Sequence, residues 1–168
     1  MDFKEALYKR ASIRKFKNQE VSNELLEELV HYGLRAPSAR NFRPWEFYVI
    51  SNKDVMVKMK EAFPYGNYNC AAMILVCGNT DRFMEGDGKD YWLEDCGAAV
   101  ENILVGAVSL GLGGIWIGTY PIKSRMDGAK NVLSLPDNII PYALLEIGYP
   151  EEINPRNIDE EDKIHYIK

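Results

Sequence analysis

The longest uncharged stretch of the chain, residues 103–122, restricts the fold more than any other feature of the sequence. Its 20 residues are enough for a helix to cross a bilayer. The middle of the stretch reads Gly111-Leu112-Gly113-Gly114, however, and clustered glycines interrupt regular secondary structure. We therefore expect a buried helix that ends near Gly111 and a buried strand that follows it, rather than a membrane span.

The composition is that of a single globular domain. The chain has 168 residues, of which 46% are hydrophobic and 27% charged, so it is long and apolar enough to bury a core and is not disordered. A net charge of -5 disfavours nucleic acid as a partner, because domains that bind nucleic acids carry a basic excess. The cysteines, Cys70, Cys77 and Cys96, are odd in number and lack CxxC spacing. They indicate free thiols and a cytoplasmic location.

Apolar periodicity and turn signals predict helices and strands in an irregular alternation. Helices are expected over residues 3–9, between Ser22 and Pro37, and over residues 53–63, 90–110 and 124–133. Strands are expected over residues 45–50, 71–77, 115–118 and 142–147. This order predicts an α+β or mixed α/β fold with three layers, a central sheet and a buried helix over residues 90–110. Residues 151–168 are polar, and such a tail either is disordered or packs on another body such as a partner subunit.

Several signatures of common sites are missing from the sequence. The two histidines, His31 and His165, do not form a cluster with ligand spacing, so no metal site is expected. There is no GxSxG elbow and no GxxxxGK[ST] phosphate loop. The glycines of residues 111–114 follow a predicted helix rather than a strand and do not fit GxGxxG.

The first positive feature is the alternation of Arg10, Ser12 and Arg14 in a basic segment. Residues 1–17 contain six basic and two acidic residues. In an extended segment alternate side chains point the same way, so these three form a row of two cations and a hydroxyl. Guanidinium groups suit phosphate oxygens, and the row is therefore a candidate phosphate site. A solvated basic turn is the alternative.

Two further segments are candidates for contact with a flat polar ring. Ser38 and Asn41 supply hydrogen-bonding groups in a loop pinned by Pro37 and Pro44, although an ordinary turn before a strand explains them as well. The glycines of residues 111–118 allow the backbone to approach a ligand closely, so the N–H groups of residues 118–120, which include Gly118 and Thr119, can face a flat ring. Tight packing of a helix on a strand also accounts for the glycines.

The order of five motifs makes the chain resemble a known family. The motifs are Arg-x-Ser-x-Arg at residues 10–14, APS-x-x-N-x-x-PW at 36–45, DCGAA at 95–99, GLGG-x-WIG at 111–118 and IGYP at 147–150. Over essentially its whole length the chain resembles the nitroreductase-like FMN-dependent oxidoreductases. The resemblance implies an α+β fold of three layers, with a mainly antiparallel sheet flanked by helices, in an intertwined homodimer. It also implies one domain over residues 1–168, whose tail, residues 151–168, packs on the partner subunit.

The same resemblance implies roles for residues of one subunit. Arg10 and Ser12 face the phosphate and ribityl end of FMN, and Arg14 faces the polar ring edge near N1 and O2. Arg156 in the tail returns to the phosphate, although a lone arginine in a tail is also commonly solvated.

The other subunit is implied to reach the same flavin with Pro37, Ser38 and Asn41. The backbone around Gly118 and Thr119 is implied to approach N5 and O4 of the ring.

The activity implied by the resemblance is a two-step transfer. NADH or NADPH gives a hydride to flavin N5, and a nitroaromatic, a quinone or a related acceptor then takes the electrons. No obligatory catalytic side chain is expected, although the cation of Arg14 tunes the flavin. A flavin-binding sensor or carrier without nicotinamide turnover is the alternative. Arg43, Ala39 and Asn154 depart from residues common in the family, and Arg43 bears on the choice of substrate.

Overall fold

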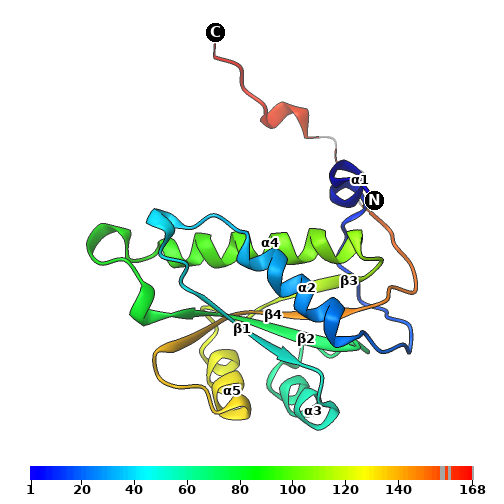
Figure 1. The fold of residues 1–168 in the computed structure, drawn as a ribbon, viewed down its shortest axis with the longest axis horizontal. Coiled ribbons are helices and arrows are strands. Elements are labelled where there is room, and N and C mark those ends of the chain that lie inside the picture. Colours follow the sequence, from blue (N-terminus) through cyan, green and yellow to red (C-terminus); the bar gives the residue numbers. More distant parts are fainter. Residues whose placement is uncertain (156–157, 159, 168) are drawn as a thin grey trace.

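A four-stranded antiparallel sheet forms the middle layer of the structure, a computed structural model that describes residues 1–155, 158 and 160–167 (Figure 1). The strands are β1 (Trp45–Ile50), β2 (Ala72–Asn79), β3 (Gly113–Gly118) and β4 (Ile139–Gly148), in the order β1-β2-β4-β3. The helices are α1 (Phe3–Lys9), α2 (Asn23–Leu34), α3 (Lys53–Ala62), α4 (Tyr91–Ser109) and α5 (Lys123–Leu133). The expected three-layer α+β architecture is confirmed.

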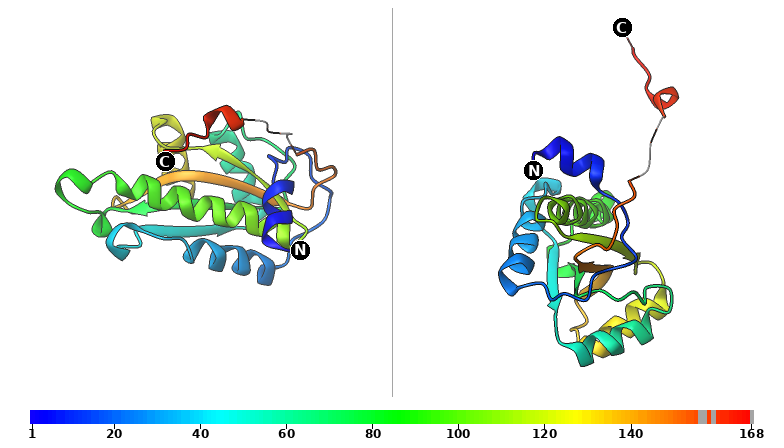
Figure 2. Two further views of the ribbon diagram at one scale, coloured as in Figure 1. Left: turned by 90° about the horizontal axis from the view of Figure 1, so that it is seen from above. Right: turned by 90° about the vertical axis from the view of Figure 1, so that its right-hand side faces the viewer.

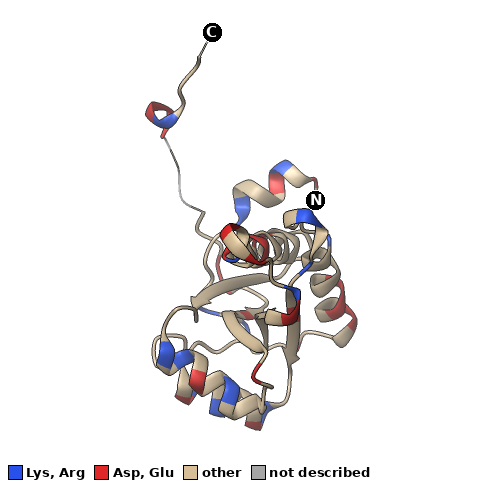
Figure 3. Cartoon of the chain, turned by 90° about the vertical axis from the view of Figure 1, so that its left-hand side faces the viewer, with Lys and Arg blue, Asp and Glu red and all other residues tan. Residues whose placement is uncertain are grey.

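The two faces of the sheet bury two separate cores. Ala72, Ile74 and Val76 of β2 pack in one core with α2 and α4, and the alternate residues of β2 pack in the other with α3 and α5. This alternation explains why β2 reads as an unbroken apolar run, because a strand that is covered on both faces has no polar side. The outward faces of α3 and α5, at the bottom of Figure 3, carry Lys or Arg interspersed with Asp or Glu.

The uncharged stretch of residues 103–122 folds as predicted. Helix α4 ends at Ser109, Gly111 adopts a left-handed conformation with φ of 74°, and β3 begins at Gly113. Within the described ranges, no helix combines the length and the apolarity needed to cross a membrane. Helix α4 corresponds to the buried helix expected over residues 90–110 and buries nine residues. It lies beside α2 in the layer over one sheet face, and its residues Ala98 and Val105 are half-buried.

Side-chain caps set the beginning of three helices. The side chains of Asp2, Ser22 and Asn52 accept hydrogen bonds from backbone N–H groups three residues further on, at 2.8, 3.4 and 3.1 Å. Each cap satisfies an N–H group that has no partner inside the helix.

Strand β4 is longer than the predicted residues 142–147. It begins at Ile139 and contains Pro141, a residue that lacks the N–H group of a normal strand position. Pro141 lies opposite Cys77, where the register between β2 and β4 shifts. Proline is tolerated at such an irregularity because the ladder of hydrogen bonds is already interrupted there.

The last described part of the tail lies away from the rest of the chain. Residues 160–167, with the short turn Glu161–Lys163, extend clear of the sheet and its helices (Figure 2). Ile164, Tyr166 and Ile167 are exposed.

Candidate functional site

The basic segment near the N-terminus lies beside the start of β3. The N–H group of Ile13 donates to the carbonyl of Gly114 at 3.1 Å, and Ser12 pairs with Gly114 in a parallel bridge. Ile13 is buried, whereas Ser12 and Arg14 on either side of it are exposed. The expected alternation of an extended segment is therefore present, with its polar side chains turned away from the core.

Arg10, Ser12 and Arg14 line one cavity of about 950 Å³. Its remaining walls come from α1, the segment after it, α4 and the tail, through Leu7, Tyr8, Ala11, Glu101, Asn154 and Ile158. Two guanidinium groups and a hydroxyl form a donor set for a phosphate monoester and an attached polyol. The volume lies within the usual range of ligand pockets. These residues fit the phosphate and ribityl end of FMN.

A carboxylate that the sequence did not reveal shares this cavity. Oε1 of Glu101 on α4 lies 3.6 Å from Nε of Arg10, and both side chains are partly exposed. Exposed ion pairs contribute little free energy, on the order of 0–1 kcal/mol. A phosphate that enters the cavity can therefore replace Glu101 as the partner of Arg10.

The far end of β3 offers one backbone donor rather than several. Thr119 and Tyr120 both donate their N–H groups to the carbonyl of Tyr142, at 3.3 and 3.0 Å. Because successive residues of an antiparallel strand alternate in direction, the N–H group of Gly118 points to the outer edge of β3. The carbonyl of Gly118 accepts a hydrogen bond from Arg125. A Cβ atom at Gly118 would meet no atom within 4 Å, so the space in front of it is open.

The loop that contains Ser38 and Asn41 is held in an unusual conformation. Arg40, Asn41 and Arg43 have φ angles of 48°, 60° and 51°, a region that residues other than glycine adopt rarely. Two side chains hold the loop. Oδ1 of Asp95 accepts from the N–H group of Ala39 at 2.9 Å, and Oγ of Ser38 accepts from that of Arg43 at 3.0 Å.

Asp95 is a buried carboxylate of α4. Burial raises the pKa of Asp95, and the hydrogen bond from the N–H group of Ala39 works in the opposite direction. The DCGAA motif at residues 95–99 contains Asp95 but does not indicate its partner, Ala39, which lies 56 positions away in the sequence. Asp95 stands directly beside Glu94 in α4, so the sequence alone did not single it out.

The two groups of predicted site residues do not meet within one chain. Glu101 contacts Arg10 and Asp95 contacts Ala39, and these two acids are six residues apart on α4. In an α-helix this spacing corresponds to a rise of about 9 Å and a rotation of about 120°. The loop accordingly lies toward the Tyr91 end of α4 and α1 toward the Ser109 end (Figure 1).

One predicted residue of the site has no described position. Arg156 lies outside the residues that the structure describes.

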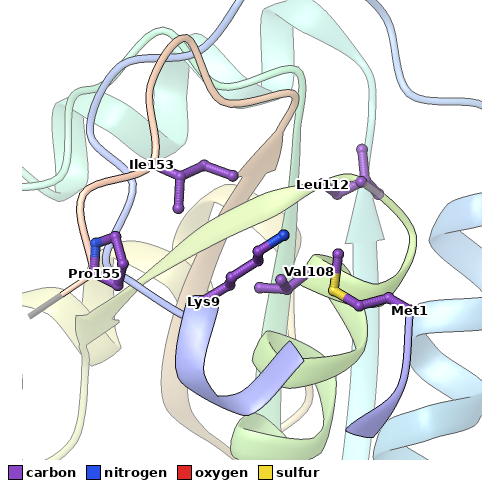
Figure 4. Close-up of a pocket in the computed structure, with 7 residues that line it drawn as sticks. Met1, Lys9, Val108, Leu112, Ile153 and Pro155 are labelled. Carbon is purple, nitrogen blue, oxygen red and sulfur yellow. The ribbon is translucent and has the colours of Figure 1, made fainter. Parts of the chain in front are cut away.

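A second cavity of about 240 Å³ lies under the start of the tail, between α1 and the end of α4 (Figure 4). Its walls are mostly apolar, and its one charged side chain, Lys9, is bonded to Glu5 at 2.7 Å.

The comparison with known proteins decides the family. A family model described as the nitroreductase family matches residues 7–64 and 65–149. The chain belongs to the nitroreductase family. The resemblance inferred from the five motifs is confirmed, as is the prediction of a nitroreductase-type oxidoreductase at the level of the family.

Members of the nitroreductase family with similar chains include proteins of archaea and bacteria. A Methanothermobacter thermautotrophicus protein, provisionally named NADH dehydrogenase/NAD(P)H nitroreductase, is 38% identical over 100% of this chain and 88% of its own. The crystal structure of a Parabacteroides distasonis protein with the same provisional name has a TM-score of 0.89 at 34% identity and covers 98% of this chain and 96% of its own. An FMN-dependent nitroreductase from Clostridium difficile has a TM-score of 0.85 at 27% identity, over 97% and 98%.

Proposed function

We propose that the protein is an FMN-dependent oxidoreductase that passes electrons from NADH or NADPH to a nitroaromatic, a quinone or a related acceptor. The observation that carries this proposal is the single cavity that Arg10, Ser12 and Arg14 line in a chain of the nitroreductase family. The printed names of similar proteins, which include an FMN-dependent nitroreductase and an NAD(P)H nitroreductase, support it.

When bound, FMN supplies the hydride chemistry at its N5 atom, and the protein supplies binding, orientation and charge. Arg10 and Ser12 hold the phosphate and the ribityl chain. Arg14 places a positive charge at the ring edge near N1 and O2, which favours the negative charge that gathers there on reduction. The outward N–H group of Gly118 would donate to the polar edge of the ring. The N–H group of Thr119 is bonded to the carbonyl of Tyr142, so Thr119 holds the end of β3 in place rather than donating to the ring.

The proposed assembly is a homodimer in which each flavin lies between two subunits. Pro37, Ser38 and Asn41 of one subunit then complete the site that Arg10 begins in the other. The separation of these two groups along α4 supports this arrangement, and so does the tail, whose exposed Ile164 and Tyr166 lie clear of the rest of the chain. Light scattering is expected to give twice the mass of one 19.2 kDa chain. A monomer that retains FMN tightly contradicts the arrangement.

Anaerobic titration tests the activity. Purified protein, supplied with FMN where needed, is expected to show flavin absorption and to lose it on addition of NADH or NADPH. Addition of a nitroaromatic or a quinone is expected to restore the absorption. Protein that takes up no FMN contradicts the proposal, and bound flavin that neither nicotinamide reduces favours a sensor or carrier instead.

A further inference from the structure

Two arginines occupy the strained part of the loop that Asp95 and Ser38 hold. Arg40 and Arg43 both have positive φ, a conformation that is strained for residues other than glycine. Asn41, between them, is a residue type that tolerates this region, but arginine has no such preference. A strained conformation that two side-chain hydrogen bonds maintain is a feature that often marks a binding site.

The loop presents these arginines as cations to solvent. Arg40, Asn41 and Arg43 are exposed, and within the described part of the chain neither guanidinium forms an ion pair. Residues 29–45 contain no Asp or Glu. The next acid, Glu46, accepts a hydrogen bond from Asn79, and Asp95 accepts one from the backbone of Ala39. An exposed guanidinium with free N–H groups binds carboxylate and other oxyanions through two parallel hydrogen bonds.

We propose that Arg40 and Arg43 form an anion-binding rim that selects electron acceptors bearing a carboxylate or sulfonate group. The inference rests on the proposed function, in which Ser38 and Asn41 of the same loop reach the flavin. Arg40 and Arg43 flank Asn41 in the chain and therefore lie at the border of that site. The two hydrogen bonds fix the backbone from which both arginines extend, so an acceptor ring with one anionic substituent is held in a restricted orientation.

A double variant, Arg40→Gln with Arg43→Gln, tests the proposal. Glutamine keeps the unbranched stem, so it leaves the backbone preference of these positions nearly unchanged while it removes the charge. The measured quantity is the ratio of kcat/KM for an anionic acceptor to that for its neutral counterpart, with 4-nitrobenzoate against nitrobenzene and 1,2-naphthoquinone-4-sulfonate against 1,2-naphthoquinone. Taking the ratio on one preparation cancels any change in flavin content. We expect the ratio to fall about 10-fold, since two partly exposed ion pairs are lost.

The control is Arg35→Gln, which removes an exposed arginine at the end of α2, outside the left-handed part of the loop. The ratio is expected to stay at its original value in this variant. An equal fall in the control and the double variant overturns the proposal, because it indicates a general effect of net charge.

Two other outcomes separate this inference from the proposed function. If the double variant reduces all four acceptors with an unchanged ratio, or if it alters only the discrimination between NADPH and NADH during flavin reduction, the anion rim for acceptors is wrong and the proposed function stands. If the original protein binds flavin but reduces none of the acceptors, the proposed function fails and this inference fails with it.

Discussion

Replacing Arg10 by alanine is expected to weaken FMN binding by about 10- to 100-fold, because hydrogen bonds between charged groups contribute roughly 1.5–3 kcal/mol. Arg10 lies at the end of α1 and lines the cavity of the proposed phosphate site. Its one ion pair in the described chain, with Glu101, is long and partly exposed, so the guanidinium is available to a ligand. The dissociation constant can be measured from the quenching of FMN fluorescence on addition of apoprotein.

Lys9→Ala is the matched control for Arg10→Ala. It removes a neighbouring cation of the same segment, but Nζ of Lys9 is bonded to Glu5 at 2.7 Å and lies on the exposed surface of α1. If both variants weaken FMN binding to the same extent, the positive charge of the segment acts as a whole and Arg10 has no specific contact.

Arg14→Ala is expected to give a different pattern from Arg10→Ala. In the proposed site Arg14 faces the ring, so its loss is expected to slow flavin reduction by NAD(P)H more than it weakens FMN retention. Stopped-flow reduction of fully loaded protein separates the two effects. Equal losses of FMN retention in both variants contradict the division of roles.

Glu146 is expected to make the protein less stable as the pH rises from about 4.5 to about 7. The side chain is fully buried on β4, and burial raises its pKa from 4.5 to about 7, partly opposed by the thiol of Cys70, the charge of Lys60 and the N–H group of Tyr68. Oε2 accepts from Tyr68 at 3.2 Å, and Oε1 has no partner among the described residues. The folded state therefore binds more protons than the unfolded state in this range.

The sign and size of the effect follow from this difference in proton binding. The stabilisation is fully present below the unfolded pKa, is lost between about pH 4.5 and pH 7, and changes no further above the folded pKa. The difference in pKa corresponds to at most about 3 kcal/mol in the free energy of unfolding. Urea unfolding of the original protein and of Glu146→Gln at several pH values measures it, because the variant lacks the titrating group.

The control for Glu146→Gln is Glu61→Gln, which changes an exposed acid of α3. It is expected to keep the pH dependence of the original protein. If the curves of Glu146→Gln and the original protein run parallel from pH 4.5 to pH 7, the buried carboxyl does not take up a proton in this range.

The sequence predicted most of what depends on neighbouring residues. The end of α4 near Gly111 and the strand over residues 45–50 each follow from a pattern within one segment. The extension of β4 through Pro141 was missed because proline normally ends a strand, and only the register shift of β2 makes it acceptable.

Contacts between distant segments were beyond the reach of the sequence patterns. The bond between Asp95 and Ala39 spans 56 positions, and the bond between Glu146 and Tyr68 spans 78. A pattern within one segment does not show which distant residues will be in contact. The conformation of the loop over residues 38–43 and the surroundings of Glu146 therefore became known only from the structure. The direction of the Gly118 N–H group likewise depends on the pairing of β3 with β4.

The six-residue interval between Asp95 and Glu101 on α4 has a consequence for the divergence of related chains. One acid anchors the loop and the other faces the cavity of Arg10. A single residue inserted between them would lengthen the helix by only about 1.5 Å but would turn one acid by about 100° relative to the other. The helix would survive, but one of the two contacts would be lost. Insertions and deletions are therefore expected to accumulate in the connecting loops and to be selected against within this interval of α4.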